Sequence, residues 1–117
     1  LDQIEAVKET TKMIKVSVMY PNAQGVSFDH EYYKTTHMPL VKSKMGKALH
    51  HYTVDKGLAG GAGDAPAFVA MGHLLVDSVE AFQAAFGPHA KEIMADIPNY
   101  TNASPVIVIS EVTVEKG

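Results

Sequence analysis

The sequence predicts a single small α+β domain with elements in the order β-α-β-β-α-β. Four segments have the alternating or β-branched pattern of strands, and two regions carry apolar side chains at helical spacing. A chain of 117 residues has the usual size of one domain. This order is that of the ferredoxin-like fold, in which two helices lie on one face of a four-stranded antiparallel sheet.

The four strands are expected at residues 13–20, 49–56, 68–76 and 106–114. In the first segment, Ile14, Val16 and Val18 alternate with polar residues, which is typical of a strand with one face in the core. The second and third strands are joined by a Gly- and Ala-rich connection, residues 57–66. This stretch lacks a phosphate-loop motif and joins two strands, so we expect a flexible turn and no nucleotide site.

The first helical region is expected to begin at Asp29, whose carboxylate can cap the free N–H groups of the first turn, and to end at Gly46. Pro39 lies inside this pattern and removes one backbone hydrogen bond, so we expect a kink near residues 37–38. At 100° per residue, one face of the helix contains Tyr33, His37, Leu40, Val41 and Met45.

The second helical region follows a predicted capping box, in which Asp77 takes the place of the usual Ser or Thr and Glu80 is the partner. Its buried stripe is expected to contain Phe82, Ala85 and Phe86. Gly87-Pro88 should interrupt the helix, and Pro98 should end the helical turn after it.

The last two strands are apolar on both faces, although two helices can cover only one face of a four-stranded sheet. An apolar patch of that size usually marks an interface. The sequence therefore predicts a homodimer in which two open sheet faces pair about a twofold axis. The alternative is that a loop or the N-terminal segment covers this face.

Composition excludes several classes of function. A net charge of −3 gives no basic face for nucleic acid, and no apolar run approaches the length of a membrane span. The absence of cysteine excludes disulfides and thiol chemistry and fits the cytoplasm. Residues 1–12 are polar and mixed in charge, so we expect an N-terminal extension, or a short native helix, ahead of the domain at 13–117.

Several strings in the sequence resemble the EthD family, which is named for a protein linked to ethyl tert-butyl ether degradation. The strings are MIKVSVMY at 13–20, F-D-x-x-Y-Y-x-x-x-H-M-P-L at 28–40, GLAGG at 57–61, MGHLLV at 71–76, FQAAFGPH at 82–89 and DIPNYT at 96–101. The resemblance covers residues 13–114 and implies a dimeric α+β barrel. Relatives of that fold include monooxygenases, isomerases, cyclases and haem enzymes, so the resemblance implies an oxidoreductase-like role in catabolic or secondary metabolism without fixing the reaction.

His37 and Tyr33 are the first candidates for a catalytic pair. They are four residues apart on the apolar face of the first helix, which makes their side chains neighbours. In a pocket between helix and sheet, such a pair could move a proton to or from an enol or a phenol. The alternative is a structural histidine that ties the helix to a backbone carbonyl.

The remaining candidates assist this pair. His73, in the third strand, is expected either to act as a second acid or base or to form a hydrogen bond in the dimer interface. Asn99 and Tyr100 follow the second helical region, where they could hold a ligand oxygen at a pocket mouth, with Leu40 as an apolar contact. Tyr100 could instead seal the edge of the core.

No metal site is expected, because His50 and His51 are adjacent in a strand and point to opposite faces. No cofactor is expected either. The first functional prediction is therefore an enzyme that performs proton transfer or oxygenation on a small enolisable or phenolic molecule. One alternative is a non-catalytic ligand-binding or stabilising partner of an oxidation system, and another, from fold kinship, is a haem-binding protein with His37 or His89 as ligand.

Overall fold

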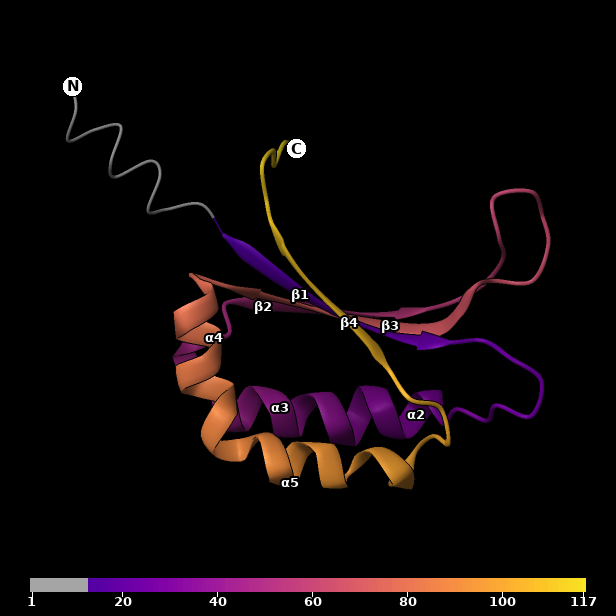
Figure 1. The fold of residues 1–117 in the computed structure, drawn as a ribbon, viewed down its shortest axis with the longest axis horizontal. Coiled ribbons are helices and arrows are strands. Elements are labelled where there is room, and N and C mark those ends of the chain that lie inside the picture. Colours follow the sequence, from indigo (N-terminus) through magenta and orange to yellow (C-terminus); the bar gives the residue numbers. More distant parts are fainter. Residues whose placement is uncertain (1–12) are drawn as a thin grey trace.

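The computed structural model describes residues 13–117, so the predicted extension at 1–12 lies outside the described part. Four strands form one antiparallel sheet with the order β2-β3-β1-β4. The helices form a second layer that covers one face of this sheet (Figure 1). The predicted ferredoxin-like α+β fold is therefore confirmed.

All four predicted strands are present, with small differences at their ends. They are β1 (Ile14–Pro21), β2 (His51–Lys56), β3 (Phe68–Val76) and β4 (Val106–Glu111). β2 starts later than predicted because the Leu49 N–H closes a 3-10 turn on the Gly46 carbonyl. β4 ends at Glu111 rather than Val114, because its partner β1 begins at Ile14.

The pairing register gives the two faces of the sheet different characters. On the helix-covered face, Val16 of β1 lies between Leu74 of β3 and Ile109 of β4. One residue further along, Ser17 is paired with His73 and Val108 on the opposite face, which we call the open face. The residues on the open face are Lys15, Ser17, Met19, His51, Thr53, Asp55, Val69, Met71, His73, Leu75, Val106, Val108 and Ser110.

The first helical region contains a widened turn where the sequence predicts a kink. It consists of α2 (His30–Tyr32), a π-helical turn η1 (Tyr33–His37), α3 (Met38–Met45) and the 3-10 turn η2 (Gly46–Ala48). The Met38 N–H reaches back five residues to the Tyr33 carbonyl. The extra residue in this turn rotates the remainder of the helix, so Met38 is buried next to His37 and Leu40 is only half-buried.

The second helical region is interrupted at Gly87-Pro88 as the sequence predicts, but Pro98 lies inside a final 3-10 turn instead of ending the helix. It contains α4 (Val79–Phe86), the 3-10 turn η3 (Gly87–His89), α5 (Ala90–Ala95) and the 3-10 turn η4 (Ile97–Asn99). The predicted capping residue was wrong by one position. Ser78 is extended and its hydroxyl accepts from the Ala81 N–H, whereas Asp77 accepts a hydrogen bond from His50.

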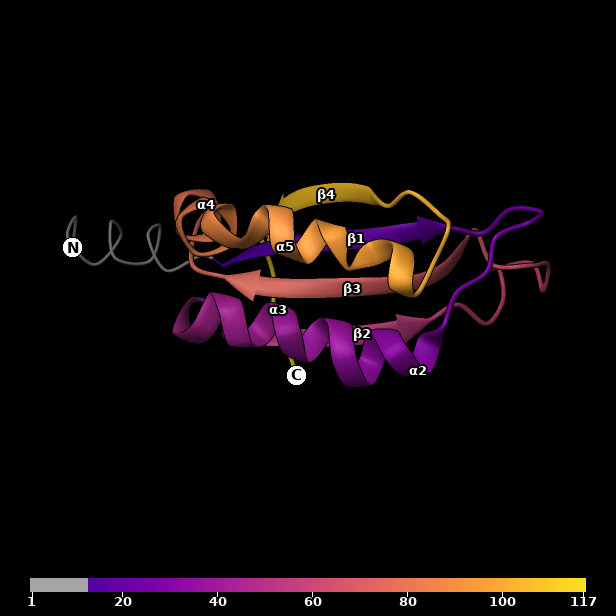
Figure 2. The ribbon, with the colours of Figure 1, turned by 90° about the horizontal axis from the view of Figure 1, so that it is seen from below.

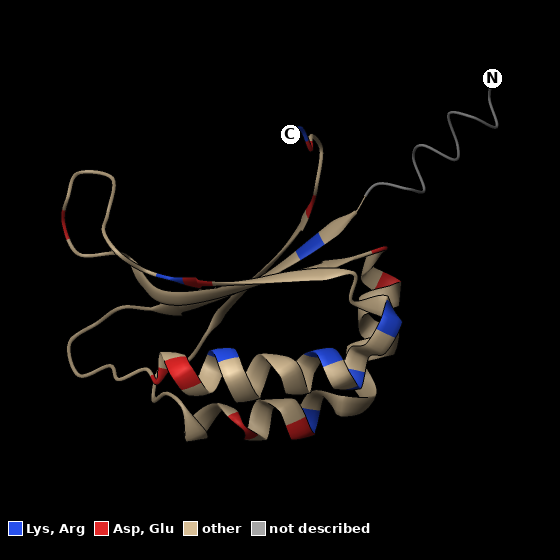
Figure 3. Cartoon of the chain, turned by 180° about the vertical axis from the view of Figure 1, so that it is seen from behind, with Lys and Arg blue, Asp and Glu red and all other residues tan. Residues whose placement is uncertain are grey.

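The helices leave the edge strand β4 uncovered, as the view from below shows (Figure 2). Four consecutive residues of β4, Val106 to Ile109, are 43–51% exposed although they alternate between the two faces. Charged positions are concentrated on the helices and near the ends of strands, and the middle of the sheet carries almost none (Figure 3). Within residues 13–117, no helix has both the length and the apolar character needed to cross a membrane.

Candidate functional site

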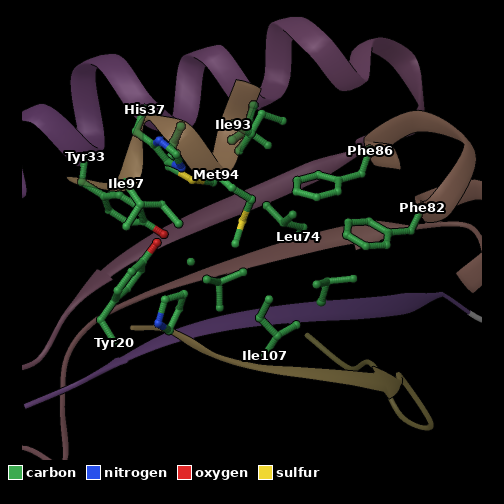
Figure 4. A pocket seen from close by; sticks show the side chains of 16 residues that line it. Tyr20, Tyr33, His37, Leu74, Phe82, Phe86, Ile93, Met94, Ile97 and Ile107 are labelled. Carbon is green, nitrogen blue, oxygen red and sulfur yellow. The ribbon is translucent and has the colours of Figure 1, made fainter. Parts of the chain in front are cut away.

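A cavity of about 120 Å³ lies between the sheet and the helices (Figure 4). Three of its sixteen lining residues bring polar side-chain groups to it: Tyr20 from β1, and Tyr33 and His37 from the π-helical turn. The other lining residues are Val16, Val18, Met38, Val41, Gly72, Leu74, Phe82, Phe86, Ile93, Met94, Ile97, Pro105 and Ile107. The cavity is thus apolar except at one end.

His37 is oriented by a carboxylate from the other helical region. The residue is 4% exposed, and its Nδ1 lies 2.9 Å from Asp96 Oδ2. A carboxylate can only accept, so Nδ1 donates, and the neutral ring keeps its lone pair on Nε2. Nε2 has no hydrogen-bond partner among the described residues, and His37 lines the cavity, so Nε2 is the ring nitrogen left free to interact with a bound molecule.

Asp96 is itself held by further hydrogen bonds. The Tyr32 hydroxyl donates to its Oδ1 at 2.7 Å, and the Asn99 amide donates to the same oxygen at 2.9 Å. Burial raises the pKa of Asp96, but the hydrogen bonds from Tyr32, Asn99 and His37 together outweigh it, and the net pKa is lowered. The carboxylate is therefore ionised at neutral pH and fixes the histidine in one orientation.

The electrostatic environment keeps His37 neutral at physiological pH. Burial lowers its pKa from the ordinary value of 6.5, and the hydrogen bond and charge of Asp96 offset this only in part. A neutral imidazole with a free Nε2 is the form that can accept a proton. The Tyr33 ring stacks on the imidazole, with centroids 5.6 Å apart and planes inclined by 15°.

The hydroxyl groups of Tyr33 and Tyr20 point toward one another at the polar end of the cavity (Figure 4). Burial raises the pKa of Tyr33 far above its usual range, so its hydroxyl stays protonated and can donate. This phenol lies directly over Gly72 of β3, where a Cβ atom would overlap the Tyr33 hydroxyl oxygen. Gly72 is thus required for the close approach of Tyr33 to the sheet.

The predicted ligand-binding residues lie near this centre but outside the cavity lining. Tyr100 is 3% exposed, its hydroxyl is hydrogen-bonded to that of Tyr20, and its ring lies 4.6 Å from the His37 ring. Asn99 is exposed and supports Asp96 through its amide. Leu40 is half-buried and does not line the cavity. The widened helical turn explains this, since it rotates Leu40 away from the face shared by Tyr33 and His37.

His73 lies on the open face of the sheet, away from the cavity. Its Nδ1 is 2.8 Å from the Ser17 hydroxyl, and its Nε2 is 3.3 Å from a carboxylate oxygen of Asp55. The neighbouring positions of the same strand, Gly72 and Leu74, line the cavity on the other face. The structure therefore brings Tyr33 and His37 together and separates His73 from them. Across residues 13–117, no three His, Cys, Asp or Glu side chains gather in a way that could hold a metal ion.

Sequence reasoning missed three contributors to this site. Asp96 is 59 positions from His37, and no local pattern links the two. Gly72 is a lone glycine in an apolar strand, which often indicates that another backbone or side chain packs closely against it. The sequence of the strand does not show which residue packs there. Tyr20 could have been found, because it continues the inward alternation of Ile14, Val16 and Val18.

Comparison with family models matches residues 24–104 to the EthD domain. The chain belongs to the EthD family. The match includes His37, Tyr33 and Asp96, and it spans the helices and strands between the first strand and β4. The resemblance found in the sequence is therefore confirmed. The chain matches no curated protein.

Solved structures share the fold, and one of them, at 55% identity, is itself EthD-like. An EthD-like protein from Ralstonia eutropha JMP134 is 55% identical with a TM-score of 0.86, over 91% of this chain and 96% of that one. An EthD family protein from Bacillus halodurans C-125 is 22% identical with a TM-score of 0.66, over 85% and 97% of the two chains. A dimeric ferredoxin-like protein of unknown function from Thermobifida fusca YX is 17% identical with a TM-score of 0.59, over 86% and 91%.

The fold extends to proteins with different chemistries. SnoaB from Streptomyces nogalater, a cofactor-independent oxygenase, is 8% identical with a TM-score of 0.55 over 92% of this chain and 96% of that one. At this identity the likeness concerns the fold alone. The reaction has to be argued from the site, because one fold carries many activities.

Proposed function

We propose that this protein is an acid–base enzyme that removes a proton from a small apolar molecule, an enolisable carbonyl compound or a phenol, without a cofactor of its own. The observation that supports this most strongly is His37, whose Nδ1 is held by Asp96 at 2.9 Å and whose ring lines an apolar cavity with Nε2 unpaired among the described residues. A histidine fixed in this way is a general base ready to accept a proton.

The groups around His37 have matching roles. The substrate C–H or O–H bond breaks, its proton goes to His37 Nε2, and the Asp96 carboxylate stabilises the imidazolium that forms. The negative charge left on the substrate oxygen is stabilised by the protonated hydroxyl of Tyr33. The apolar surroundings strengthen both interactions because little water is present to screen them.

Deuterium exchange tests this step without knowledge of the full reaction. Small neutral ketones such as cyclohexanone and phenylacetone would be incubated with the protein in deuterated water, and NMR would follow the loss of protons next to the carbonyl. We expect the protein to accelerate exchange, and His37→Gln to lower the rate by roughly a hundredfold, as expected for loss of a general base.

His50→Gln is the matched control, because His50 also bonds a carboxylate, that of Asp77, but lies on the surface. This variant should keep the wild-type rate, and Tyr33→Phe should show a partial loss. Exchange at the buffer rate for every ketone, or equal rates for His37→Gln and His50→Gln, would contradict the proposal.

The electron-rich anion formed by this step could also react with dioxygen, which is the oxygenation considered from the sequence. The fold shared with SnoaB supports keeping this second candidate. An oxygen electrode separates the two outcomes, since proton transfer alone consumes no oxygen. A ligand-binding role without turnover would give binding with no exchange. The haem-binding alternative stays a prediction, which a Soret band after addition of haem would test.

We also propose that two copies pair through their open faces. Val106 and Val108 are 46% and 43% exposed, and Met71 and Leu75 add apolar area beside them. The dimeric protein from Thermobifida fusca, which has the same fold, is consistent with this arrangement. In such a dimer, the interaction of His73 with Ser17 and Asp55 would lie within the interface, which would keep these polar groups satisfied.

A further inference from the structure

The size and polarity of the cavity restrict what it can bind. Its volume of about 120 Å³ is close to that of an engineered apolar cavity of roughly 150 Å³ that binds benzene. One aromatic or six-membered ring is therefore about the largest group that the enclosed part can hold.

The lining also restricts the charge of the ligand. Among the described residues that line the cavity, none is Asp, Glu, Lys or Arg. A charged ligand would lose its hydration without gaining an ion-pair partner, which is strongly unfavourable. The polar groups of Tyr20, Tyr33 and His37 lie together at one end, so one oxygen-bearing group of the ligand can be satisfied and a second one cannot.

The cavity opens to the surface along one side. Met94 of α5 is 45% exposed and Ile107 of β4 is 51% exposed, although both line the cavity. These two residues, with Ile97 and Pro105, also line an open groove of about 520 Å³ that continues past residues 101–104. We call this exposed side of the cavity, bordered by Met94 and Ile107, the slot. It exists because the helices do not extend over β4.

We propose that the ligand is a neutral single-ring compound with one hydroxyl or carbonyl oxygen at the Tyr33–His37 end and an apolar substituent that leaves through the slot into the groove. This inference rests on the proposed function of the same cavity and adds the class of substrate. Para-alkylphenols have this shape. Such a phenol donates its hydroxyl hydrogen to His37 Nε2 in a hydrogen bond, and its oxygen accepts from the Tyr33 hydroxyl.

Calorimetric titration of the full chain tests the inference. The probes are phenol, para-ethylphenol, para-butylphenol and para-hydroxybenzoate, the last being a charged compound of about the same size as para-ethylphenol. Each added methylene group should tighten binding about fourfold, because the slot lets the chain reach apolar surface. Para-hydroxybenzoate should show no measurable binding.

Variants at the slot locate the substituent. Met94→Asp should weaken binding of para-butylphenol roughly tenfold and change binding of phenol little, because an aspartate there places a hydrated charge beside the alkyl chain. Lys91→Asp is the matched control, since Lys91 is exposed on the same helix but does not line the cavity. Thermal unfolding of both variants would check that each is folded.

The outcomes separate this inference from the proposed function. Alkylphenols that bind with the expected dependence on chain length, with no deuterium exchange into any ketone, would support the ligand class and overturn the catalytic role. Exchange that depends on His37, together with binding of para-hydroxybenzoate as tight as that of para-ethylphenol, would overturn the ligand class alone. Binding that weakens with chain length, or equal effects of Met94→Asp and Lys91→Asp, would also overturn it.

Discussion

The properties of the site come from the environment of single residues. His37 alone is an ordinary imidazole, and its burial at 4% exposure makes the charged form unfavourable while Asp96 holds the neutral form in one orientation. Tyr33 is kept protonated by the same burial. At neutral pH, a neutral base and a protonated hydrogen-bond donor therefore lie side by side. Two solvent-exposed residues of the same types would not be held in these protonation states as efficiently.

The lowered pKa of His37 predicts how stability depends on pH. Because the folded protein binds this proton less readily than the unfolded chain, the contribution of His37 to the free energy of unfolding is complete above about pH 6.5. It is lost as the pH falls from there through the lower pKa of the folded state. Wild type and His37→Gln would be compared by urea unfolding between about pH 8 and about pH 5.

As the pH falls over this range, the free energy of unfolding should decrease more for the wild type than for His37→Gln. The difference in this free energy between the two proteins should therefore change below about pH 6.5 and stay constant above it. Both proteins contain the other histidines, so the contributions of those histidines to the pH dependence cancel in the comparison. One of them is His30, whose pKa is also lowered, with burial as the largest cause. Parallel stability curves for the two proteins would show that the environment of His37 does not lower its pKa in this way.

At the scale of elements, the π-helical turn η1 determines which side chains reach the cavity. Pro39, at the start of α3, has no N–H to offer the preceding turn, and the Met38 N–H bonds the Tyr33 carbonyl across five residues. Tyr33, His37 and Met38 therefore all face the sheet, which a regular helix would not allow. Turns of this kind often occur at functional sites.

The start of α4 gives a prediction at the same scale. The Ser78 hydroxyl accepts a hydrogen bond from the Ala81 N–H, so Ser78→Ala should lower the free energy of unfolding by about 1 kcal/mol. Urea unfolding measures the difference. Asp77→Ala is the control, because it removes only an exposed contact with His50 and should change stability little. A larger loss in Asp77→Ala than in Ser78→Ala would reverse our assignment of the cap.

At the scale of the whole molecule, the unequal cover of the sheet is the main feature. The helices lie over β1, β2 and β3 and leave β4 exposed on both sides (Figures 1 and 2). One side of β4 then borders the slot, through Ile107, and the other side belongs to the open face, through Val106 and Val108. Access to the cavity and the proposed dimer contact thus depend on the same edge strand.

Two neighbouring residues of β4 provide a test of the dimer. Val108 faces the open side and Ile109 faces the helix side, and they are similarly exposed, at 43% and 47%. We expect a wild-type dimer in sedimentation experiments at micromolar concentration. Val108→Asp should dissociate it because a charge would be buried between the sheets, and Ile109→Asp should not. A monomeric wild type, or equal dissociation by both variants, would contradict open-face pairing.

Much of the fold could be predicted because its signals are local. The alternation in β1 and the spacing of Tyr33 and His37 depend on residues close together in the chain, and both predicted the correct face. Asp29 at the start of the first helix and Gly46 at its end were likewise predicted and are confirmed as caps. Leu40 is half-buried and outside the cavity lining because the widened turn depends on how this helix packs and hydrogen-bonds, which helical periodicity ignores.

The sequence by itself determined the order of elements, the inward faces of the central strands and the pairing of Tyr33 with His37. Only the tertiary structure decided that Asp96 orients His37, that Gly72 makes room for Tyr33, and that His73 belongs to the open face and not to the cavity. The physical reason is distance along the chain. Periodicity fixes which way a side chain points within its own element, but the partner it meets is set by how separate elements pack.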